Sequence, residues 1–248
     1  MLTLLLVSTL CLVATKVSVS DTVTTFASTD IWPMLQHDKN HTGYSLDTNI
    51  YPVPSLSKIW EFDTTYLIKP PPVVSNDGVY VVRADGYVYK LDLFIGSPLW
   101  SSPTNIGAGV AASLAVNQVT SHVYVGAQDG RLIALDTGNG GTSWTFTVAG
   151  PCDWADPIFS GGFVYTGSSS TNEAYKINEP TGTSVWGFLT PNNGAPASVA
   201  VESGVVYVAS NFVNFFPPPP NDFRLYAVND VTPPTLKWQT SCLAGSID

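Results

Sequence analysis

Short apolar stretches separated by turn residues run through most of the chain. β-Branched and aromatic residues alternate over 79–82 and 87–91, and these two stretches flank Asp85-Gly86. An Asp-Gly pair between such stretches is a strong signal for a β-hairpin, because the tight turn needs a positive φ. Asp129-Gly130 repeats the arrangement. No segment after the N-terminal region shows a helical period over ten residues, so the pattern predicts an all-β protein of short strands.

A repeat marked by tryptophan sets the length of each structural unit. Five tryptophans recur at spacings of 40, 44, 42 and 52 residues, namely Trp60, Trp100, Trp144, Trp186 and Trp238. Such a period is typical of a four-stranded propeller blade. In the first complete unit the strands are expected at 73–74, 79–82, 87–91 and 99–101. Units of this kind stack their sheets radially, so each sheet buries its faces against its neighbours.

An eleven-residue pattern covers the third strand of each unit and the turn after it. An Asp or Asn is followed by Gly after four residues and by Trp after eight, except that the last unit has Pro233 in place of Gly and one extra residue. Asp and Asn bond the backbone of a tight turn, Gly supplies positive φ, and Trp offers a flat face for packing between sheets. We assign this structural role to Asp92, Gly96, Trp100, Asp136, Gly140, Trp144, Asn178, Gly182, Trp186, Asn229 and Trp238.

This pattern resembles the PQQ-like β-propeller repeat, which occurs in quinoprotein dehydrogenases and in non-enzymatic relatives of the BamB type. The resemblance covers roughly residues 32–248, and Trp32-Pro33-Met34 also looks like the opening of many such proteins. It implies a β-propeller of four-stranded blades. In the enzymes of the family, carboxylate and amide oxygens hold pyrroloquinoline quinone (PQQ) over calcium, and an Asp acts as general base. The WD40 propeller is the alternative, but its Gly-His and Trp-Asp signatures are absent from the repeats.

The number of repeats predicts an incomplete ring. We divide the chain into an N-terminal segment over 21–59 and PQQ-like repeats over 60–248, which leave room for about four to five blades. A half-unit is expected around Trp60. Two interpretations follow: the chain is a fragment of a longer protein, or it closes as a small propeller or by pairing with another copy.

The N-terminus predicts export. Residues 1–20 carry an apolar run over 2–13, and Ser18 and Ser20 fit a signal-peptide cleavage site. An uncleaved anchor or a buried strand is the alternative. Asn40 starts an Asn-x-Ser/Thr sequon and is a glycosylation candidate. We therefore expect a secreted protein, without a stable membrane span because no second long apolar run follows.

Composition excludes some partners. The formal net charge is −9 and only 12% of the residues are charged, which argues against nucleic acid, because binding it needs a basic face. Disorder is also excluded, since 44% of the residues are hydrophobic.

Few residues suggest chemistry. The segment that contains Cys152, Asp153, Trp154 and Asp156 precedes the first strand of a unit and is the best local candidate for cofactor binding, but ordinary loop and turn chemistry is the favoured explanation. Asp85 and Asp129 are expected to be turn residues rather than metal ligands, and His122 is expected at the surface. No catalytic constellation is evident, and the adjacent cysteine pair common in the enzymes is missing.

An insertion in the last unit is the most distinctive feature outside the repeat. Residues 211–222 read NFVNFFPPPPND, and four consecutive prolines favour an extended polyproline II segment. A tolerated surface loop is the alternative to a partner-binding segment. The partner-binding candidates are Phe212, Phe215, Phe216, Pro217, Pro218, Pro219 and Pro220.

Together these features predict a secreted, non-catalytic propeller that serves as a binding scaffold for a protein or carbohydrate partner. The alternative is a PQQ- and calcium-dependent alcohol or sugar oxidoreductase, or a fragment of one.

Overall fold

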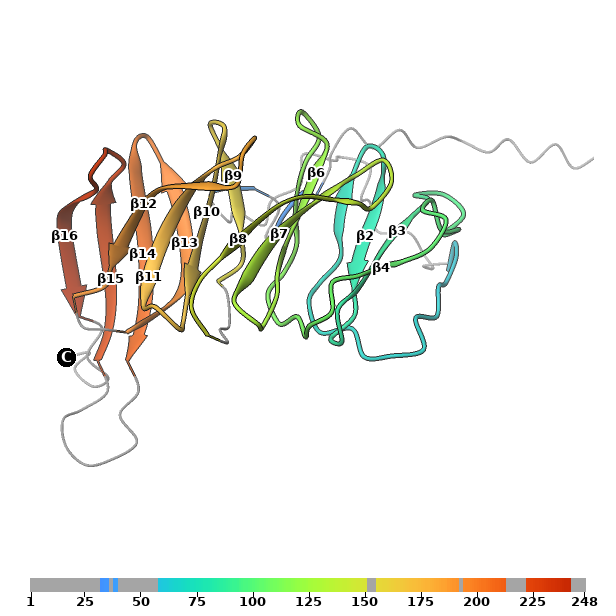
Figure 1. Cartoon of the computed structure of the whole chain (residues 1–248), viewed down its shortest axis with the longest axis horizontal. Helices are drawn as coiled ribbons and strands as arrows, with labels where there is room; N and C mark the ends of the chain where they lie inside the picture. The colour runs from blue at the N-terminus through green and yellow to red at the C-terminus, as the bar shows by residue number, and fades with distance from the viewer. Residues whose placement is uncertain are drawn as a thin grey trace, which may run out of the picture.

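A computed structural model describes residues 32–35, 38–39, 58–150, 155–191, 194–212 and 222–241. These residues form four antiparallel sheets of four strands each, and each sheet is built from consecutive strands (Figure 1). The strands are β1 Val73–Ser75, β2 Gly78–Val82, β3 Tyr87–Leu91, β4 Thr104–Asn105, β5 Ala115–Asn117, β6 His122–Gly126, β7 Arg131–Asp136, β8 Thr142–Thr147, β9 Ile158–Ser160, β10 Phe163–Ser168, β11 Glu173–Asn178, β12 Thr183–Leu189, β13 Ala195–Glu202, β14 Val205–Phe212, β15 Asp222–Asn229 and β16 Thr235–Ser241. The predicted all-β propeller fold is confirmed.

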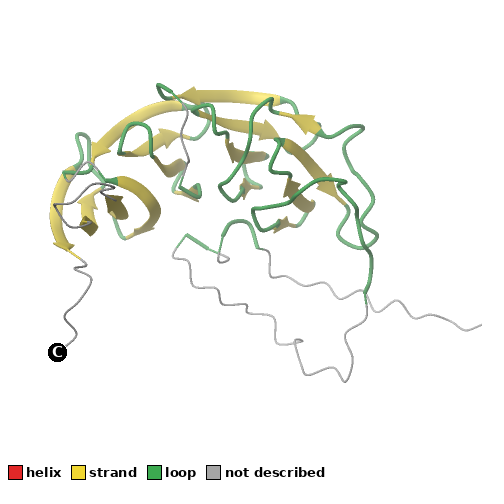
Figure 2. Cartoon of the chain, turned by 90° about the horizontal axis from the view of Figure 1, so that it is seen from below, coloured by secondary structure: helices red, strands yellow, loops and turns green. Residues whose placement is uncertain are grey.

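The four sheets are propeller blades arranged in an arc (Figure 2). The first strands of successive blades contact one another: β1 meets β5, β5 meets β9, and β9 meets β13. These strands therefore line the inner side of the arc, and the fourth strands lie outside. The described residues contain no helix, and hence none that could cross a membrane.

The Asp-Gly hairpins form where the sequence places them. Gly86 between β2 and β3 has a φ of 93°, and Gly130 between β6 and β7 has a φ of 94°. A Cβ at Gly86 would lie 2.1 Å from the carbonyl oxygen of Ala108. Only glycine therefore fits this turn, for reasons of both conformation and space.

The prediction of a strand at 99–101 is wrong. These residues form a bend, and the fourth strand of the first blade is instead the short β4. At the start of the bend, the chain pairs with β3 through a bridge between Leu91 and Pro98 and one bond from Leu99 N to Lys90 O. Pro98 and Pro103 flank the bend, and proline has no N–H to donate to a sheet.

Three tryptophans of the repeat pack on the turn glycine of the following unit. The indoles of Trp100, Trp144 and Trp186 are only 5–8% exposed. A Cβ on the turn glycine of the next unit would come within 3 Å of the indole atoms, so the ring lies directly on the glycine. The pairs in this arrangement are Trp60 on Gly96, Trp100 on Gly140 and Trp144 on Gly182.

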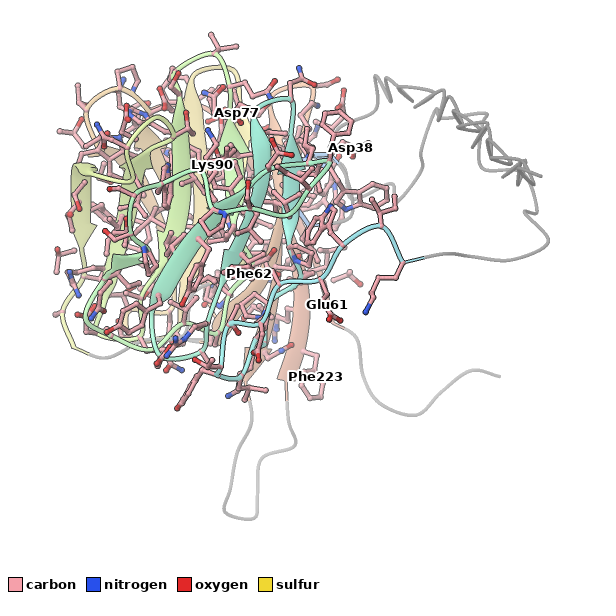
Figure 3. All side chains as sticks on the ribbon, turned by 90° about the vertical axis from the view of Figure 1, so that its right-hand side faces the viewer. Asp38, Glu61, Phe62, Asp77, Lys90 and Phe223 are labelled. Carbon is pink, nitrogen blue, oxygen red and sulfur yellow. The ribbon has the colours of Figure 1, made fainter. Side chains whose placement is uncertain are left out.

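The two ends of the arc differ. Trp60 lies on the first blade, where it packs on Gly96, but the surrounding residues 58–72 form no strand. Phe62 from the same segment contacts Tyr89 edge to face with ring centroids 5.4 Å apart (Figure 3). At the other end, Trp238 is 42% exposed. No later blade covers it among the described residues.

Candidate functional site

One end of the blades carries the described residues that flank both candidate segments of the sequence. We term it the hairpin end: it carries the β2–β3, β6–β7, β10–β11 and β14–β15 hairpins and the connectors between blades (lower edge of Figure 1). Residues 151–154 precede the described chain that leads into β9; this chain starts at the hairpin end, since Ala155 N donates at 2.8 Å to the carbonyl of Gly167 near the end of β10. Residues 213–221 join β14 to β15. The opposite end, which carries the turns of the eleven-residue pattern, is termed the turn end; Phe223 and Asp77 mark the two ends in Figure 3.

The cofactor candidate is described only in part. Cys152, Asp153 and Trp154 lie outside the described residues, as do Asn40 and the signal segment. The carboxylate of Asp156 accepts a hydrogen bond from the backbone N–H of Ser113, in the connector between the first and second blades. Asp156 thus ties the third blade to that connector.

An arginine and an aspartate anchor the hairpin of the first blade. Arg83 donates from Nε to Asp85 at 2.9 Å and its NH1 donates to Tyr89 OH at 3.2 Å. The guanidinium lies over the rings of Tyr87 and Tyr66, with its carbon 4.6 and 5.0 Å from the ring centroids. The bond from Arg83 holds the pKa of Asp85 below its usual value, despite opposing desolvation. Both charges are therefore used within the hairpin and its neighbouring segment.

The second blade repeats this anchor with the order of charges reversed. Arg131 donates from Nε to Asp129 at 2.8 Å and from NH2 to the carbonyl of Ile106 at 2.6 Å. The bond from Arg131 lowers the pKa of Asp129. Since Ile106 follows the last strand of the first blade, this arginine joins two blades.

The described residues contain no cluster of carboxylates for calcium. Calcium takes six to eight oxygen ligands, but Asp85, Asp129 and Asp156 each already accept a bond from an arginine or a backbone N–H. No group of three or more His, Cys, Asp or Glu side chains within the described ranges could hold a metal ion.

The insertion starts later than the sequence suggested. Phe212 pairs with Asp222 as the last register pair of β14 and β15, so both residues belong to strands rather than to the loop. Phe215, Phe216 and the four prolines 217–220 lie outside the described residues.

The turn end holds buried charges that the sequence analysis missed. At the junction between the third and fourth blades, Asp230 accepts bonds from Lys176 Nζ at 2.7 and 2.8 Å, Tyr165 OH at 2.7 Å and Trp186 Nε1 at 3.0 Å. Burial alone would raise the pKa of Asp230, but these bonds outweigh it and lower the pKa. The carboxylate of the fourth blade thus holds three side chains of the third.

The first junction uses a related arrangement. Lys90 donates to Asp77 at 2.7 Å and to the carbonyl of Thr137 in the second blade at 2.9 Å (Figure 3). Trp100 Nε1 donates to the same carbonyl at 3.0 Å. Tyr80 OH bonds Asp77 at 3.1 Å. Here the carboxylate belongs to the first blade, and the second supplies only a backbone acceptor.

The middle junction corrects the expectation for His122. Its imidazole is only 14% exposed and lies 2.7 Å from the buried carboxylate of Glu179 in the third blade. The histidine starts a strand, as expected, but the neighbouring blade covers it. One sequence signal could have indicated such junctions: Lys90 and Lys176 open the eleven-residue pattern at a position that alanine fills in the other two blades.

Comparison with known proteins identifies the family. Residues 56–170 and 95–232 match the family described as outer membrane protein assembly factor BamB, a PQQ-repeat family. The quinohemoprotein alcohol dehydrogenase of Comamonas testosteroni is 33% identical over 129 residues, which cover 48% of this chain and 18% of that protein. The 1-butanol dehydrogenase (cytochrome c) of Thauera butanivorans is 29% identical over 132 residues, covering 49% and 19%. The chain therefore spans less than a fifth of either relative.

Solved structures share the fold. The quinohemoprotein alcohol dehydrogenase ADHIIG from Pseudomonas putida HK5 aligns with a TM-score of 0.71 at 19% identity, over 85% of this chain and 40% of that one. BamB from Moraxella catarrhalis aligns with a TM-score of 0.55 at 16% identity, over 73% and 64%. Since the family match spans well over half of the chain, the chain belongs to the BamB-type PQQ-repeat family.

Proposed function

We propose that this member of the BamB-type PQQ-repeat family is a secreted, non-catalytic scaffold that binds a protein partner at the hairpin end, mainly through the β14–β15 hairpin. The observation that carries the proposal is the length of this hairpin. β14 and β15 have eight residues each, against five in β2 and β3. Tyr80 and Tyr207 are each the third residue of their strand, so the three extra residues of β14 all lie at the hairpin end. They extend the strand by about 10 Å.

The composition of the connecting segment favours a protein partner. It carries Phe215 and Phe216 followed by four prolines. Polyproline II segments lose little entropy on binding and are gripped by grooves lined with aromatic side chains. The use of Arg83, Arg131 and Asp156 within the fold also suits a scaffold, because these charges hold the hairpins and connectors together. The family's description as an assembly factor agrees with this role.

The scaffold function is tested by site-specific crosslinking in the source organism. A photoreactive phenylalanine analogue replaces Phe215, and a matched variant carries it at Val119, which is 91% exposed at the turn end. A discrete protein adduct from position 215 and none from position 119 is the expected result. Adducts of equal yield from both positions, or none from position 215, would contradict the proposal.

A second variant separates the hairpin from its tip. Replacing 213–221 by Asn-Gly suits the Phe212 and Asp222 register, since a two-residue type I′ turn closes such a pair. The variant should fold with unchanged stability and lose partner binding. A glycan array on the intact chain tests the carbohydrate alternative, and selective glycan binding that survives the deletion would favour it.

The enzyme is the second candidate function, and the similarity to two dehydrogenases favours it. Titration of the folded chain with PQQ and Ca²⁺, followed by PQQ fluorescence and then by dye reduction with primary alcohols, separates the two. We expect no saturable PQQ signal. Calcium-dependent saturation together with dye reduction would replace the scaffold by the enzyme.

A further inference from the structure

We propose that the junction between the second and third blades is a proton-dependent clasp: protonated His122 holds the buried carboxylate of Glu179, and loss of that proton weakens the contact between the two blades.

The geometry of the clasp joins two blades through one oxygen atom. Glu179 lies in the turn between β11 and β12, and its side chain is fully buried. Its Oε1 accepts bonds from Thr120 Oγ1 at 2.5 Å, Tyr124 OH at 2.6 Å and His122 Nδ1 at 2.7 Å. All three donors belong to the second blade. A buried carboxylate is stable only when it is hydrogen-bonded and balanced by a positive charge.

Comparison of the repeats shows that a different type of residue supplies the positive charge at this junction. In the third blade, Lys176 pairs across from Tyr165 in register and binds Asp230. The second blade has Ala134 at the position of Lys176, paired across from Tyr124. Lysine keeps its charge until about pH 10, whereas histidine titrates in the neutral range. The two junctions are therefore built alike but differ in their response to protons.

In the second blade the cation lies on β6, as His122, whereas in the third blade it lies on the third strand, β11, as Lys176. His122 stands two residues before Tyr124, where the third blade has Phe163 two residues before Tyr165. The swap is thus paired: Phe and Lys in the third blade correspond to His and Ala in the second. The sequence exchanges a permanent cation for a titratable one while keeping a cation at the junction.

Two buried polar atoms of the middle junction make no hydrogen bond to the described residues. Glu179 Oε2 and Trp144 Nε1 are buried without a hydrogen-bond partner among the described residues. In the third junction the corresponding indole, Trp186 Nε1, donates to Asp230. Loss of the charge on His122 would therefore leave a buried carboxylate that is hydrogen-bonded but has no counter-charge among the groups bonded to it. The imidazole is 14% exposed, so its proton can exchange with water.

The other groups around the clasp do not supply a charge. Asn117 Nδ2 bonds Thr120, and both side chains are neutral. Burial and the bond to Glu179 raise the pKa of Tyr124, so its hydroxyl remains a donor. Asp136 lies across from His122 in register, and its Oδ1 accepts from the turn N–H groups of Gly138 and Asn139. In the described part of the chain, His122 is the basic group that bonds Glu179.

The sign of the effect follows from the charges. While His122 is protonated, the carboxylate is paired and the junction is tight. As the pH rises and the histidine loses its proton, the charge pairing and its contribution to stability are lost. The clasp therefore weakens toward alkaline pH.

The test measures urea unfolding of the full chain between pH 6 and 8.5. The chain has three histidines, so H37Q/H41Q serves as the parent in which His122 is the remaining histidine. We expect its unfolding equilibrium constant to rise on the order of tenfold across this range. The variant that adds His122→Phe and Ala134→Lys installs the arrangement of the third junction and should remove the rise. An equal rise in both proteins would overturn the proposal.

A second readout keeps the proposal testable if that variant does not fold. The ring nitrogens of His122 are followed by NMR as a function of pH in the parent and in Glu179→Gln. We expect the ring of the parent to lose its proton at a higher pH than the ring of the Gln variant. Identical titration curves, or a neutral ring already at pH 6 in the parent, would show that no proton-dependent clasp exists.

Discussion

Replacing Asp230 by alanine should be among the most destabilising single changes in the arc. The carboxylate binds Lys176 twice, at 2.7 and 2.8 Å, and also bonds Tyr165 and Trp186. The charged side chains of Lys176 and Asp230 are each only 11% exposed. The substitution leaves the ammonium group between the third and fourth blades without its counter-charge, and the phenol and the indole lose an acceptor.

The expected magnitude is set by the unpaired charge. Removing one partner of a buried ion pair costs about 3–5 kcal/mol, which is a large part of the roughly 5–15 kcal/mol that stabilises an ordinary domain. Solvent at the edge of the junction places our estimate at the lower end, about 3 kcal/mol. Urea unfolding followed by tryptophan fluorescence measures this loss, provided that the slope of the transition is unchanged.

A double-mutant cycle tests the reasoning behind that number. Lys176→Met keeps the apolar length of the side chain and removes its charge. If the unpaired charge dominates, Lys176→Met combined with Asp230→Ala should be more stable than Asp230→Ala alone, by about 1–3 kcal/mol. A loss below about 1 kcal/mol for Asp230→Ala, or strictly additive losses, would refute the argument.

Three further predictions concern the same junctions. Gly182→Ala should destabilise the protein by about 1–3 kcal/mol more than Gly161→Ala. Both glycines have positive φ, but only a Cβ at Gly182 would meet an indole, at 2.6 Å. Thermal and urea unfolding compare the two variants, and equal losses of stability would contradict the packing argument. Trp186→Ala should cost about 3–5 kcal/mol and Trp238→Ala less than half as much, because the indoles are 5% and 42% exposed; the same assay decides. The lowered pKa of Asp230 predicts a stabilising contribution that is complete above about pH 4 and lost as the pH falls further. Asp230→Asn should flatten this acid dependence, and an unchanged profile would exclude Asp230 as its source.

Much of the fold could be predicted because its determinants are local. Asp85-Gly86 and Asp129-Gly130 specify hairpins through backbone conformation alone, and the observed φ values agree. The period of the tryptophans predicted four-stranded units, and the described residues form four sheets of four strands each. The failure at 99–101 was also local: the prediction gave the tryptophan strand of the first unit the same form as in the others, although Pro98 and Pro103 cannot donate to a ladder.

The junction chemistry could not be predicted in the same way. Glu179 and His122 are 57 residues apart, and Asp230 and Lys176 are 54 apart. Apart from the position of Lys176 in the eleven-residue pattern, nothing in the local sequence distinguishes these charged residues from solvated ones on a turn or strand. The assignment of His122 to the surface was wrong for this reason, since the neighbouring blade covers most of its side chain.

By itself, the sequence determined the repeat: the length of the unit, its strands and hairpins, and the tryptophan and turn glycine that each unit presents. These features depend on backbone conformation and side-chain size within a few residues, which the sequence states directly. Only the tertiary structure decided which indole lies on which glycine, which carboxylates are buried, and which cation balances each of them. Those outcomes depend on the approach of two sheets, where burial removes water and makes each unpaired charge costly.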